Sequence, residues 1–354
     1  MTEPASDAPD ASTAPAGIDA DNVTAWFEAH APGAAPPLTF RPIAGGHSNL
    51  TYRVDDSAGH AWVLRRGPLH HVLATAHDMG REHRIISALA DTPVPVPATV
   101  GLCDDPAVNG APFYVMGFVD GAVVRDQAAG RELDEAARWR AGGQVADVLA
   151  AIHAVDPDAV GLGDLGRKEA YLQRQLRRWH GQWEQSRTRD LPVVDEVHAE
   201  LAARAPEQGP AAIVHGDYRL DNCLVGSDGT IRAVLDWELC TLGDPLADVG
   251  LLLVYWTEPG DEHTALADSA TLLPGFPSRA ELIERYANAS GRDVSAVDYY
   301  VAFGYWKLAC ILEGVFARYQ AGAMGQAADS FDLFGRQVEV LAQAARTTLA
   351  RVSR

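Results

Sequence analysis

Hydrophobic residues follow two different spacings along the chain. From about residue 38 to residue 118, short apolar runs are broken every few residues by Gly, Pro, Asn or Asp, which is typical of β-strands joined by turns. This part is predicted to hold five strands, with one helix between the third and the fourth. The strands are expected at 38–43, 50–54, 61–65, 99–103 and 113–118, and the helix at 79–89.

The rest of the chain has the three- and four-residue apolar spacing of amphipathic helices. Helices are expected at 133–154, 168–186, 193–204, 245–255, 278–289, 297–320 and 328–351. A hairpin with strands at 222–225 and 231–235 interrupts them. The pattern predicts an α+β fold in two lobes, a small antiparallel β lobe with one helix and a larger, mainly helical lobe. The hinge is expected near Val119–Gly121.

The N-terminal segment has a different composition. Residues 1–19 are mostly Ala, Pro, Asp, Ser and Thr, and they have almost no large apolar side chain to bury. A disordered tail is therefore expected at 1–19, followed by a short helix at about 21–30 with Asp21 as its N-cap. The two lobes are expected at 20–119 and 120–354.

Composition and charge exclude several classes of protein. The chain has 354 residues, 47% hydrophobic and 22% charged, which fits two globular domains. The net charge of −19 argues against a sequence-independent nucleic-acid binder, which needs a basic face. No run of 18 apolar residues and no basic-then-apolar leader is present, so neither a membrane partner nor secretion is expected. The four cysteines have no C-x-x-C spacing and fit reduced thiols in a cytoplasmic protein.

The most informative motif begins at His215-Gly216-Asp217, directly after an apolar run. Asn222 follows Asp217 by five positions, and Asp236 stands at the end of the hairpin. Phosphoryl transfer from ATP needs a carboxylate that accepts or orients the acceptor hydroxyl proton, and oxygen ligands that hold Mg²⁺. Either Asp alone fits a turn residue equally well. The D-x-x-x-x-N motif from Asp217 to Asn222 and the distal Asp236-Trp237-Glu238, each after an apolar run, together favour a phosphotransferase site.

This motif resembles the catalytic loop and the metal-binding motif of the aminoglycoside phosphotransferase and choline kinase-like families, which are small-molecule relatives of the protein kinases. The resemblance covers about residues 38–330. It implies a bilobal protein kinase-like fold, with nucleotide bound by 20–119 and the catalytic loop and acceptor site in 120–354. It also implies ATP and Mg²⁺ as cofactors, Asp217 as the catalytic base, and Asn222 and Asp236 as metal ligands.

The resemblance also assigns nucleotide contacts in the β lobe. The loop between the first two strands stands where the family binds phosphate, so Gly45, Gly46, His47 and Ser48 are expected to contact phosphate oxygens. A plain hairpin turn is the alternative for this Gly pair. Backbone groups from Met116 to Phe118, next to the hinge, are expected to meet the adenine edge.

The third strand departs from the family pattern. Arg65 stands where the family usually has a phosphate-clamping Lys, and the two side chains are not equivalent at such a site. The sequence Leu64-Arg65-Arg66 is similar to that of kinase-like domains linked to certain acyl-CoA dehydrogenases. Glu82 matches the helix Glu that orients the clamp, and a solvated surface Glu is its alternative.

Two features separate the chain from protein kinases. Gly216 replaces the Arg with which those enzymes read a phosphorylated activation loop, and only eleven residues separate Asp236 from Asp248. Regulation by loop phosphorylation and a protein substrate are therefore not expected. Asp244, before Pro245, is expected to start a helix, and Asp248 to brace the catalytic loop through hydrogen bonds.

The chain is accordingly expected to be a kinase for a hydroxyl group of a small molecule. A hydroxyacyl-CoA or related acyl metabolite is the first expectation for the acceptor, because residues 64–66 and 217–222 resemble the dehydrogenase-linked branch. An aminoglycoside or another amino-alcohol is the second, and the net charge of −19 favours it. A nucleotide-binding regulator without turnover is a third reading, motivated by Arg65.

Overall fold

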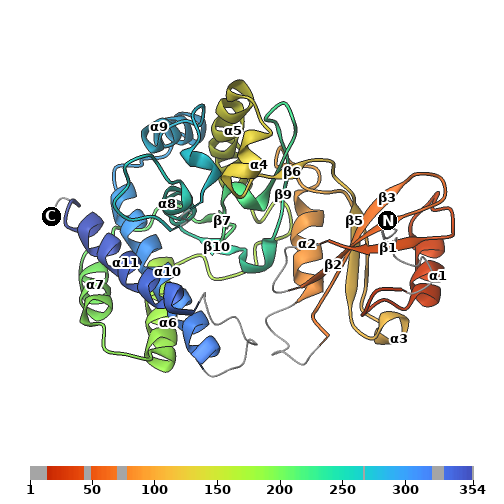
Figure 1. Cartoon of the computed structure of the whole chain (residues 1–354), viewed down its shortest axis with the longest axis horizontal. Helices are drawn as coiled ribbons and strands as arrows, with labels where there is room; N and C mark the ends of the chain where they lie inside the picture. Colours follow the sequence, from red (N-terminus) through yellow and green to blue (C-terminus); the bar gives the residue numbers. More distant parts are fainter. Residues whose placement is uncertain (1–13, 44–48, 70–77, 266–267, 321–330, 353–354) are drawn as a thin grey trace, which may run out of the picture. The chain divides into compact units, whose positions relative to one another are not determined.

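The computed structural model describes residues 14–43, 49–69, 78–265, 268–320 and 331–352 (Figure 1). The chain forms two compact units. Unit 1 comprises Met1–Ala90 and Pro97–Val119, and unit 2 comprises Asp91–Val96 and Asp120–Arg354. The chain thus passes from unit 1 to unit 2 after Val119, within the segment predicted as the hinge. The segment Asp91–Val96, which belongs to unit 2, was predicted to be part of the β lobe.

Unit 1 is built on a five-stranded antiparallel sheet with the strand order β1-β2-β3-β5-β4. Its strands are β1 (Thr39–Pro42), β2 (Leu50–Asp55), β3 (Ala61–Arg66), β4 (Thr99–Cys103) and β5 (Phe113–Gly117). Each lies within two residues of its predicted range. Helix α2 (Met79–Leu89) has the predicted bounds, and the Asp78 carboxylate caps it by accepting the Arg81 N–H.

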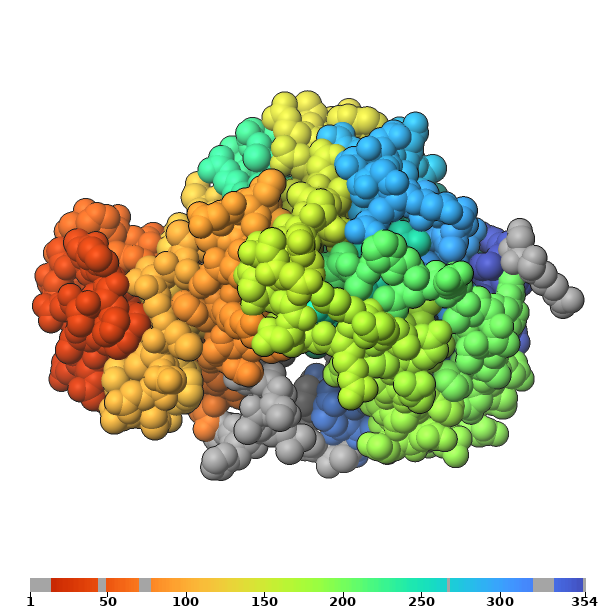
Figure 2. Space-filling view, turned by 180° about the vertical axis from the view of Figure 1, so that it is seen from behind, coloured from red at the N-terminus to blue at the C-terminus, as the bar shows by residue number. Residues whose placement is uncertain are grey.

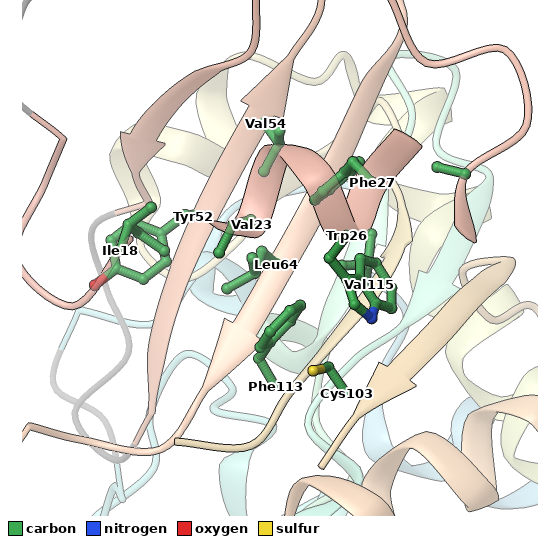
Figure 3. Packing of buried hydrophobic residues seen from close by; sticks show 11 residues of the cluster. Ile18, Val23, Trp26, Phe27, Tyr52, Val54, Leu64, Cys103, Phe113 and Val115 are labelled. Atoms are coloured by element: carbon green, nitrogen blue, oxygen red, sulfur yellow. The ribbon is translucent and has the colours of Figure 1, made fainter. Parts of the chain in front are cut away.

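Helix α1 (Ala20–His30) covers one face of this sheet (Figure 3). Val23, Trp26 and Phe27 pack there against sheet residues such as Leu64 and Phe113. The N-cap is Asp19, whose carboxylate accepts the Asn22 N–H, and the prediction of Asp21 was wrong. Asp21 lies in the first turn instead, where a negative charge complements the helix dipole.

The predicted disordered tail is too long. Ile18 is buried in the same hydrophobic cluster, and the Tyr52 hydroxyl donates to the carbonyl oxygen of Ala16. The Arg66 guanidinium donates to the carbonyl oxygen of Gly17. One apolar side chain and two carbonyl anchors therefore hold the segment immediately before α1 on the sheet. Residues 1–13 lie outside the described part of the chain.

Unit 2 contains seven long helices among its described residues. They are α5 (Glu135–Ala154), α6 (Tyr171–Ser186), α7 (Pro192–Ala203), α8 (Leu246–Tyr255), α9 (Arg279–Ser290), α10 (Val297–Gln320) and α11 (Phe331–Leu349). All seven overlap predicted helices.

Several short elements of both units were not predicted, because they span too few residues to show a hydrophobic period. They are α3 (Pro106–Asn109), α4 (Gln127–Arg131), β6 (Ala122–Val123), β7 (Ala212–Val214) and β10 (Thr241–Gly243).

Helix α10 is the central helix of unit 2. It packs against α6, α8 and α11. By length and composition it is apolar enough to cross a membrane, but 72% of its apolar window is buried inside the unit. Its hydrophobic surface is therefore used in packing the core.

The hairpin of unit 2 consists of β8 (Cys223–Val225) and β9 (Ile231–Val234), with β6 pairing to β8. Cys223 is the register partner of Val234. The backbone ladder continues beyond both strands, because the Leu235 N–H donates to the carbonyl oxygen of Asn222 at 2.8 Å. Asn222 and Asp236 are thus brought to the same end of the hairpin.

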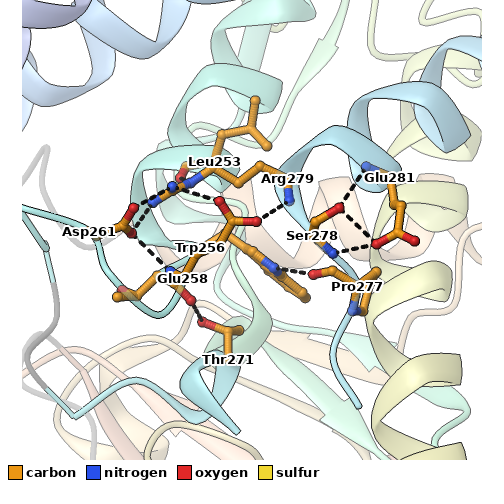
Figure 4. A network of polar contacts seen from close by, with 10 residues as sticks. Leu253, Trp256, Glu258, Asp261, Thr271, Pro277, Ser278, Arg279 and Glu281 are labelled. Carbon is orange, nitrogen blue, oxygen red and sulfur yellow. Dashed lines mark hydrogen bonds and ion pairs between the residues drawn. The ribbon is translucent and has the colours of Figure 1, made fainter. Parts of the chain in front are cut away.

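A network of charged groups fixes the beginning of α9 (Figure 4). The Arg279 guanidinium pairs with Asp261 at 2.6 Å and with Glu258 at 3.0 Å. Ser278 and Glu281 form a capping box at the first turn. Both acidic partners come from the segment after α8, so α9 is tied to that segment and the charge of Arg279 is compensated.

Candidate functional site

The first part of the motif, from His215 to Asn222, lies in one loop between β7 and β8, which we call the Asp217 loop; Asp236 follows β9. Gly216 gives this loop its shape. Its φ is +87°, and a Cβ at this position would lie 2.7 Å from the carbonyl oxygen of Leu239. Any side chain at this position would force the residue into a disfavoured backbone conformation and would displace Leu239. The Arg that protein kinases have here therefore does not fit.

Asp248, in the first turn of α8, holds the start of the Asp217 loop. Its carboxylate accepts the N–H of His215 at 2.6 Å and the N–H of Gly216 at 2.9 Å, which confirms the predicted bracing role. Burial by itself would raise the pKa of Asp248, but hydrogen bonds from His153 and from the Gly216 backbone outweigh it and hold the pKa below its usual value. The brace is therefore a charged carboxylate.

His215 links the two halves of the motif. Its Nδ1 accepts the Asp217 N–H at 3.3 Å, and its Nε2 lies 3.0 Å from the carbonyl oxygen of Leu235. These partners assign the proton to Nε2, which donates to Leu235. Both ring nitrogens are thus used, and His215 ties the backbone of Asp217 to the residue preceding Asp236.

Asp217 and Asn222 contact each other directly. The Asn222 side-chain nitrogen Nδ2 donates to the Asp217 carbonyl oxygen at 2.8 Å and to Asp217 Oδ2 at 3.0 Å. The Arg219 Nε lies 3.5 Å from the same Oδ2 and 3.2 Å from Asp221 Oδ1. The Asp217 carboxylate is therefore oriented by an amide and placed beside a cation.

Asp236 adopts the left-handed backbone conformation, with φ +63°, which is uncommon for a non-glycine residue. Among the described residues, Ala170 is the other non-glycine residue with positive φ. Such strain persists only where the surroundings fix it, and it clusters at functional sites. The next residue, Trp237, is fully buried, and its indole Nε1 donates to the Val234 carbonyl oxygen. The aromatic anchor holds the strained turn in place.

The oxygen donors at this end of the hairpin fit Mg²⁺. Asn222 offers its amide oxygen, since both of its hydrogen bonds to Asp217 use the nitrogen, and Asp236 offers a carboxylate. Mg²⁺ prefers oxygen ligands and usually takes one or two carboxylates together with substrate phosphates. In the described ranges, no three His, Cys, Asp or Glu side chains gather into a metal-holding group.

In unit 1, Arg65 and Glu82 form an ion pair. The Arg65 Nε lies 3.1 Å from Glu82 Oε2, and the Glu82 side chain is 2% exposed, so it is not the solvated surface residue that the alternative reading required. Arg66 lies on the other face of β3 and donates to the carbonyl oxygens of Gly17 and Asn109. Arg65 and Arg66 thus point to opposite faces of β3, as neighbouring residues of a strand do.

The structure places the other predicted nucleotide contacts only in part. Met116 lies in β5 between Val63 and Thr99. The N–H of Gly117 donates to Ala98 and that of Phe118 to Ala61, so neither amide is available to a ligand. Gly45, Gly46, His47 and Ser48 fall outside the described residues.

Three residues of the site neighbourhood were not singled out from the sequence. Arg219 stacks over the Tyr255 ring at 4.7 Å, and the Tyr218 hydroxyl donates to the Val145 carbonyl oxygen. The Lys307 Nζ donates to the Gly216 carbonyl oxygen at 3.0 Å. Arg219 lies inside the motif, and its positive charge between two aspartates is a signal that it contacts them. The only sequence signal for Lys307 is the rarity of lysine in this chain.

Asp244 has the structural role expected of it. It accepts the Leu246 N–H at 3.1 Å, at the start of α8, and the Tyr300 hydroxyl at 2.6 Å. These bonds join α8 to α10 and so set the position of Asp248.

Comparisons with known proteins give the family. The model of the phosphotransferase enzyme family (APH) matches residues 39–282. Acyl-CoA dehydrogenase family member 11 of Gallus gallus is 34% identical over 316 residues, which is 87% of this chain and 40% of that protein. The chain spans less than half the length of the curated acyl-CoA dehydrogenase relatives that it matches.

Solved structures extend the likeness over nearly the whole chain. A crystal structure from Ralstonia eutropha, described as a candidate aminoglycoside phosphotransferase, is 34% identical, covers 95% of this chain and 99% of that one, and has a TM-score of 0.81. A mutant of aminoglycoside phosphotransferase APH(4)-Ia, in a ternary complex with AMP-PNP and hygromycin B, is 16% identical, covers 91% of this chain and 97% of that one, and has a TM-score of 0.57, so it shares the fold. The chain therefore belongs to the phosphotransferase enzyme family and has its α+β, protein kinase-like fold.

Proposed function

We propose that the protein is an ATP- and Mg²⁺-dependent kinase that transfers the γ-phosphoryl group to a hydroxyl of a small molecule. One observation carries the proposal: the Asn222 amide donates to both the carbonyl oxygen and the carboxylate of Asp217. A general base and a metal ligand are thereby fixed relative to each other. Phosphoryl transfer depends mainly on such positioning and on electrostatic stabilisation.

In this mechanism, Asp217 accepts the proton of the acceptor hydroxyl as the oxygen attacks the γ-phosphorus of ATP. The P–O bond to ADP breaks, and the proton passes from Asp217 to solvent. Asn222 keeps the carboxylate in one orientation throughout. Mg²⁺, held by Asn222 and Asp236, would compensate charge on the phosphate oxygens. Arg65, oriented by Glu82, holds the nucleotide phosphates as a bidentate cation.

The acceptor is proposed to be a hydroxyacyl-CoA or a related acyl metabolite. The curated relatives named as acyl-CoA dehydrogenases support this class. The resemblance of residues 64–66 and 217–222 to the dehydrogenase-linked branch supports it too.

An amine-bearing alcohol is the second candidate. The net charge of −19 favours a cationic acceptor, and the APH(4)-Ia structure holds hygromycin B.

A panel of acceptors decides between the two candidates. Hydroxyacyl-CoAs, free hydroxy acids, homoserine and aminoglycosides are incubated with MgATP, and ADP release is measured together with the ³¹P spectrum of the product. The proposal expects a phosphate ester of a hydroxyacyl-CoA. An aminoglycoside ester would establish the second candidate. If nucleotide binds but no member of the panel is phosphorylated, the protein is the non-catalytic regulator.

A further inference from the structure

Lysine is rare in this protein. The chain has two lysines, Lys168 and Lys307, among its 29 Lys and Arg residues, and even the proposed phosphate clamp is an arginine. Lys168 is a surface residue that pairs with Asp158 at 2.5 Å. Lys307 is only 8% exposed and lies in the middle of α10. Burying an ammonium is costly unless it finds partners, so its contacts identify its role.

The contacts of Lys307 lead to the Asp217 loop. Its Nζ donates to the carbonyl oxygen of Gly216 at 3.0 Å and lies 5.6 Å from the centre of the Trp179 ring. Trp179 comes from α6, which packs against α10 and is part of the surface of unit 2 seen in Figure 2. The ammonium is thus enclosed between an aromatic ring on one helix and a loop carbonyl.

Lys307 and Asp248 bind the same short stretch of backbone, Asp248 through its N–H groups and Lys307 through a carbonyl oxygen. Asp248 accepts the N–H of His215 and of Gly216, and Lys307 takes the Gly216 carbonyl, which belongs to the peptide bond to Asp217. An anion on α8 and a cation on α10 therefore fix the peptide planes that immediately precede the Asp217 Cα.

Electrostatics agrees with this arrangement. Burial has the largest influence on the Lys307 pKa and lowers it, and Arg178 lowers it further, while Asp217 and Asp248 raise it. The two carboxylates therefore lie close enough to favour the charged ammonium. A thioether or an alkyl side chain of the same length would fill the space, but it would leave the Gly216 carbonyl without this partner.

We infer that Lys307 is a positioning residue for the phosphoryl transfer proposed above. Its ammonium fixes the Gly216–Asp217 peptide and thereby aims the Asp217 carboxylate at the acceptor hydroxyl. The inference rests on the proposed function, because the reaction in question is the one for which Asp217 is the base. Lys307 itself need not touch either substrate.

Steady-state kinetics of Lys307→Met, with Lys168→Met as the matched control, tests this role. Misplacement of a catalytic group by about 1 Å can cost about 10²-fold in rate, so kcat should fall by about that factor in Lys307→Met. The KM values for MgATP and acceptor should change less than about threefold, because the variant leaves the binding groups in place. Lys307→Arg should recover part of the loss, and Lys168→Met should match the wild type.

A double-mutant cycle separates positioning from general structural damage. In the Asp217→Asn background, Lys307→Met should cause almost no further loss of the residual kcat, because there is no base left to aim. Equal losses in both backgrounds would overturn the inference, as would a wild-type kcat in Lys307→Met. Full turnover by Asp217→Asn alone would instead refute the proposed function.

A second measurement does not depend on turnover or on a stable Lys307 variant. Lysine labelled with ¹³C and ¹⁵N gives two side-chain signals in this protein, and Lys168→Met assigns them. Asp217→Asn should shift the Lys307 ε-carbon and Nζ signals and leave those of Lys168 in place. If the Lys307 signals do not move, the ammonium does not sense Asp217 and the inference fails.

Discussion

Asn222 donates two hydrogen bonds from one amide nitrogen to Asp217, one to the backbone carbonyl oxygen and one to the carboxylate. The spacing of five residues is short enough for the loop to close on itself, so both groups are set by local geometry. His215 then joins this pair to the backbone before Asp236. The arrangement leads to predictions that can be measured separately.

Gly216→Ala should destabilise the protein and remove its activity. The substitution places a Cβ against the Leu239 carbonyl oxygen at a φ of +87°, and strain of this kind costs about 1–3 kcal/mol. Gly260→Ala is the matched control, because Gly260 has φ +93° but nothing within 4 Å of its Cβ. Calorimetric melting of both variants should show the larger loss of Tm in Gly216→Ala. Equal losses would mean that the contact with Leu239 is relieved easily.

Arg65→Met should raise KM for ATP and lower kcat, because the guanidinium is proposed to contact phosphates in both ground and transition states. Arg65→Lys should recover only part, since an ammonium lacks the planar fork. Arg66→Met should act mainly on stability, because Arg66 is buried and bonded to the Gly17 and Asn109 carbonyls. The assignment of the clamp fails if Arg65→Met has normal ATP kinetics.

Asp236→Ala should abolish Mg²⁺-dependent nucleotide binding, because a carboxylate that bridges metal and phosphates serves both. Asp228→Ala is the control, since Asp228 lies in the exposed turn of the same hairpin and its carboxylate accepts hydrogen bonds from Thr230. Titration calorimetry with ATP, in the presence of Mg²⁺ or of EDTA, measures the effect. Unchanged MgATP affinity in Asp236→Ala would make Asp236 a turn residue.

Stability should fall as the pH is lowered from about 7 to about 5. Burial holds the pKa of His153 below its ordinary value of 6.5, although Asp248 acts in the opposite direction. Below pH 6.5 the unfolded chain binds a proton that the folded chain refuses, so the free energy of unfolding decreases, by at most about 1.4 kcal/mol per pH unit for one group. Tm measured across this range should fall less steeply in His153→Gln. An identical slope would show that other groups carry the dependence.

Much of the fold could be predicted because its signals are local. The alternation in β3 placed Arg65 and Arg66 on opposite faces, and α2 began and ended at its predicted residues. Asp217 and Asn222 stand five positions apart in one motif, so their contact is also local. Local signals also failed where two caps competed, since Asp19 and not Asp21 accepts the first-turn N–H of α1.

Contacts between residues distant in sequence could not be predicted. Ile18 orders the segment before α1 only because the sheet and α1 form a cluster around it. Lys307 meets Gly216 across 91 positions of sequence and belongs to no motif. The sequence does not distinguish Glu82 from an ordinary exposed Glu on a helix. Only the folded structure shows that it is buried and paired with Arg65.

The most direct test of the account compares Asp217→Asn with the wild-type protein in the acceptor assay, together with the affinity of both for MgATP. The amide keeps the shape of the side chain and removes the base. The account predicts a loss of about 10²–10⁴-fold in kcat, with MgATP affinity nearly unchanged. Turnover close to that of the wild type would contradict the assignment of Asp217 as the base, and with it the proposed function.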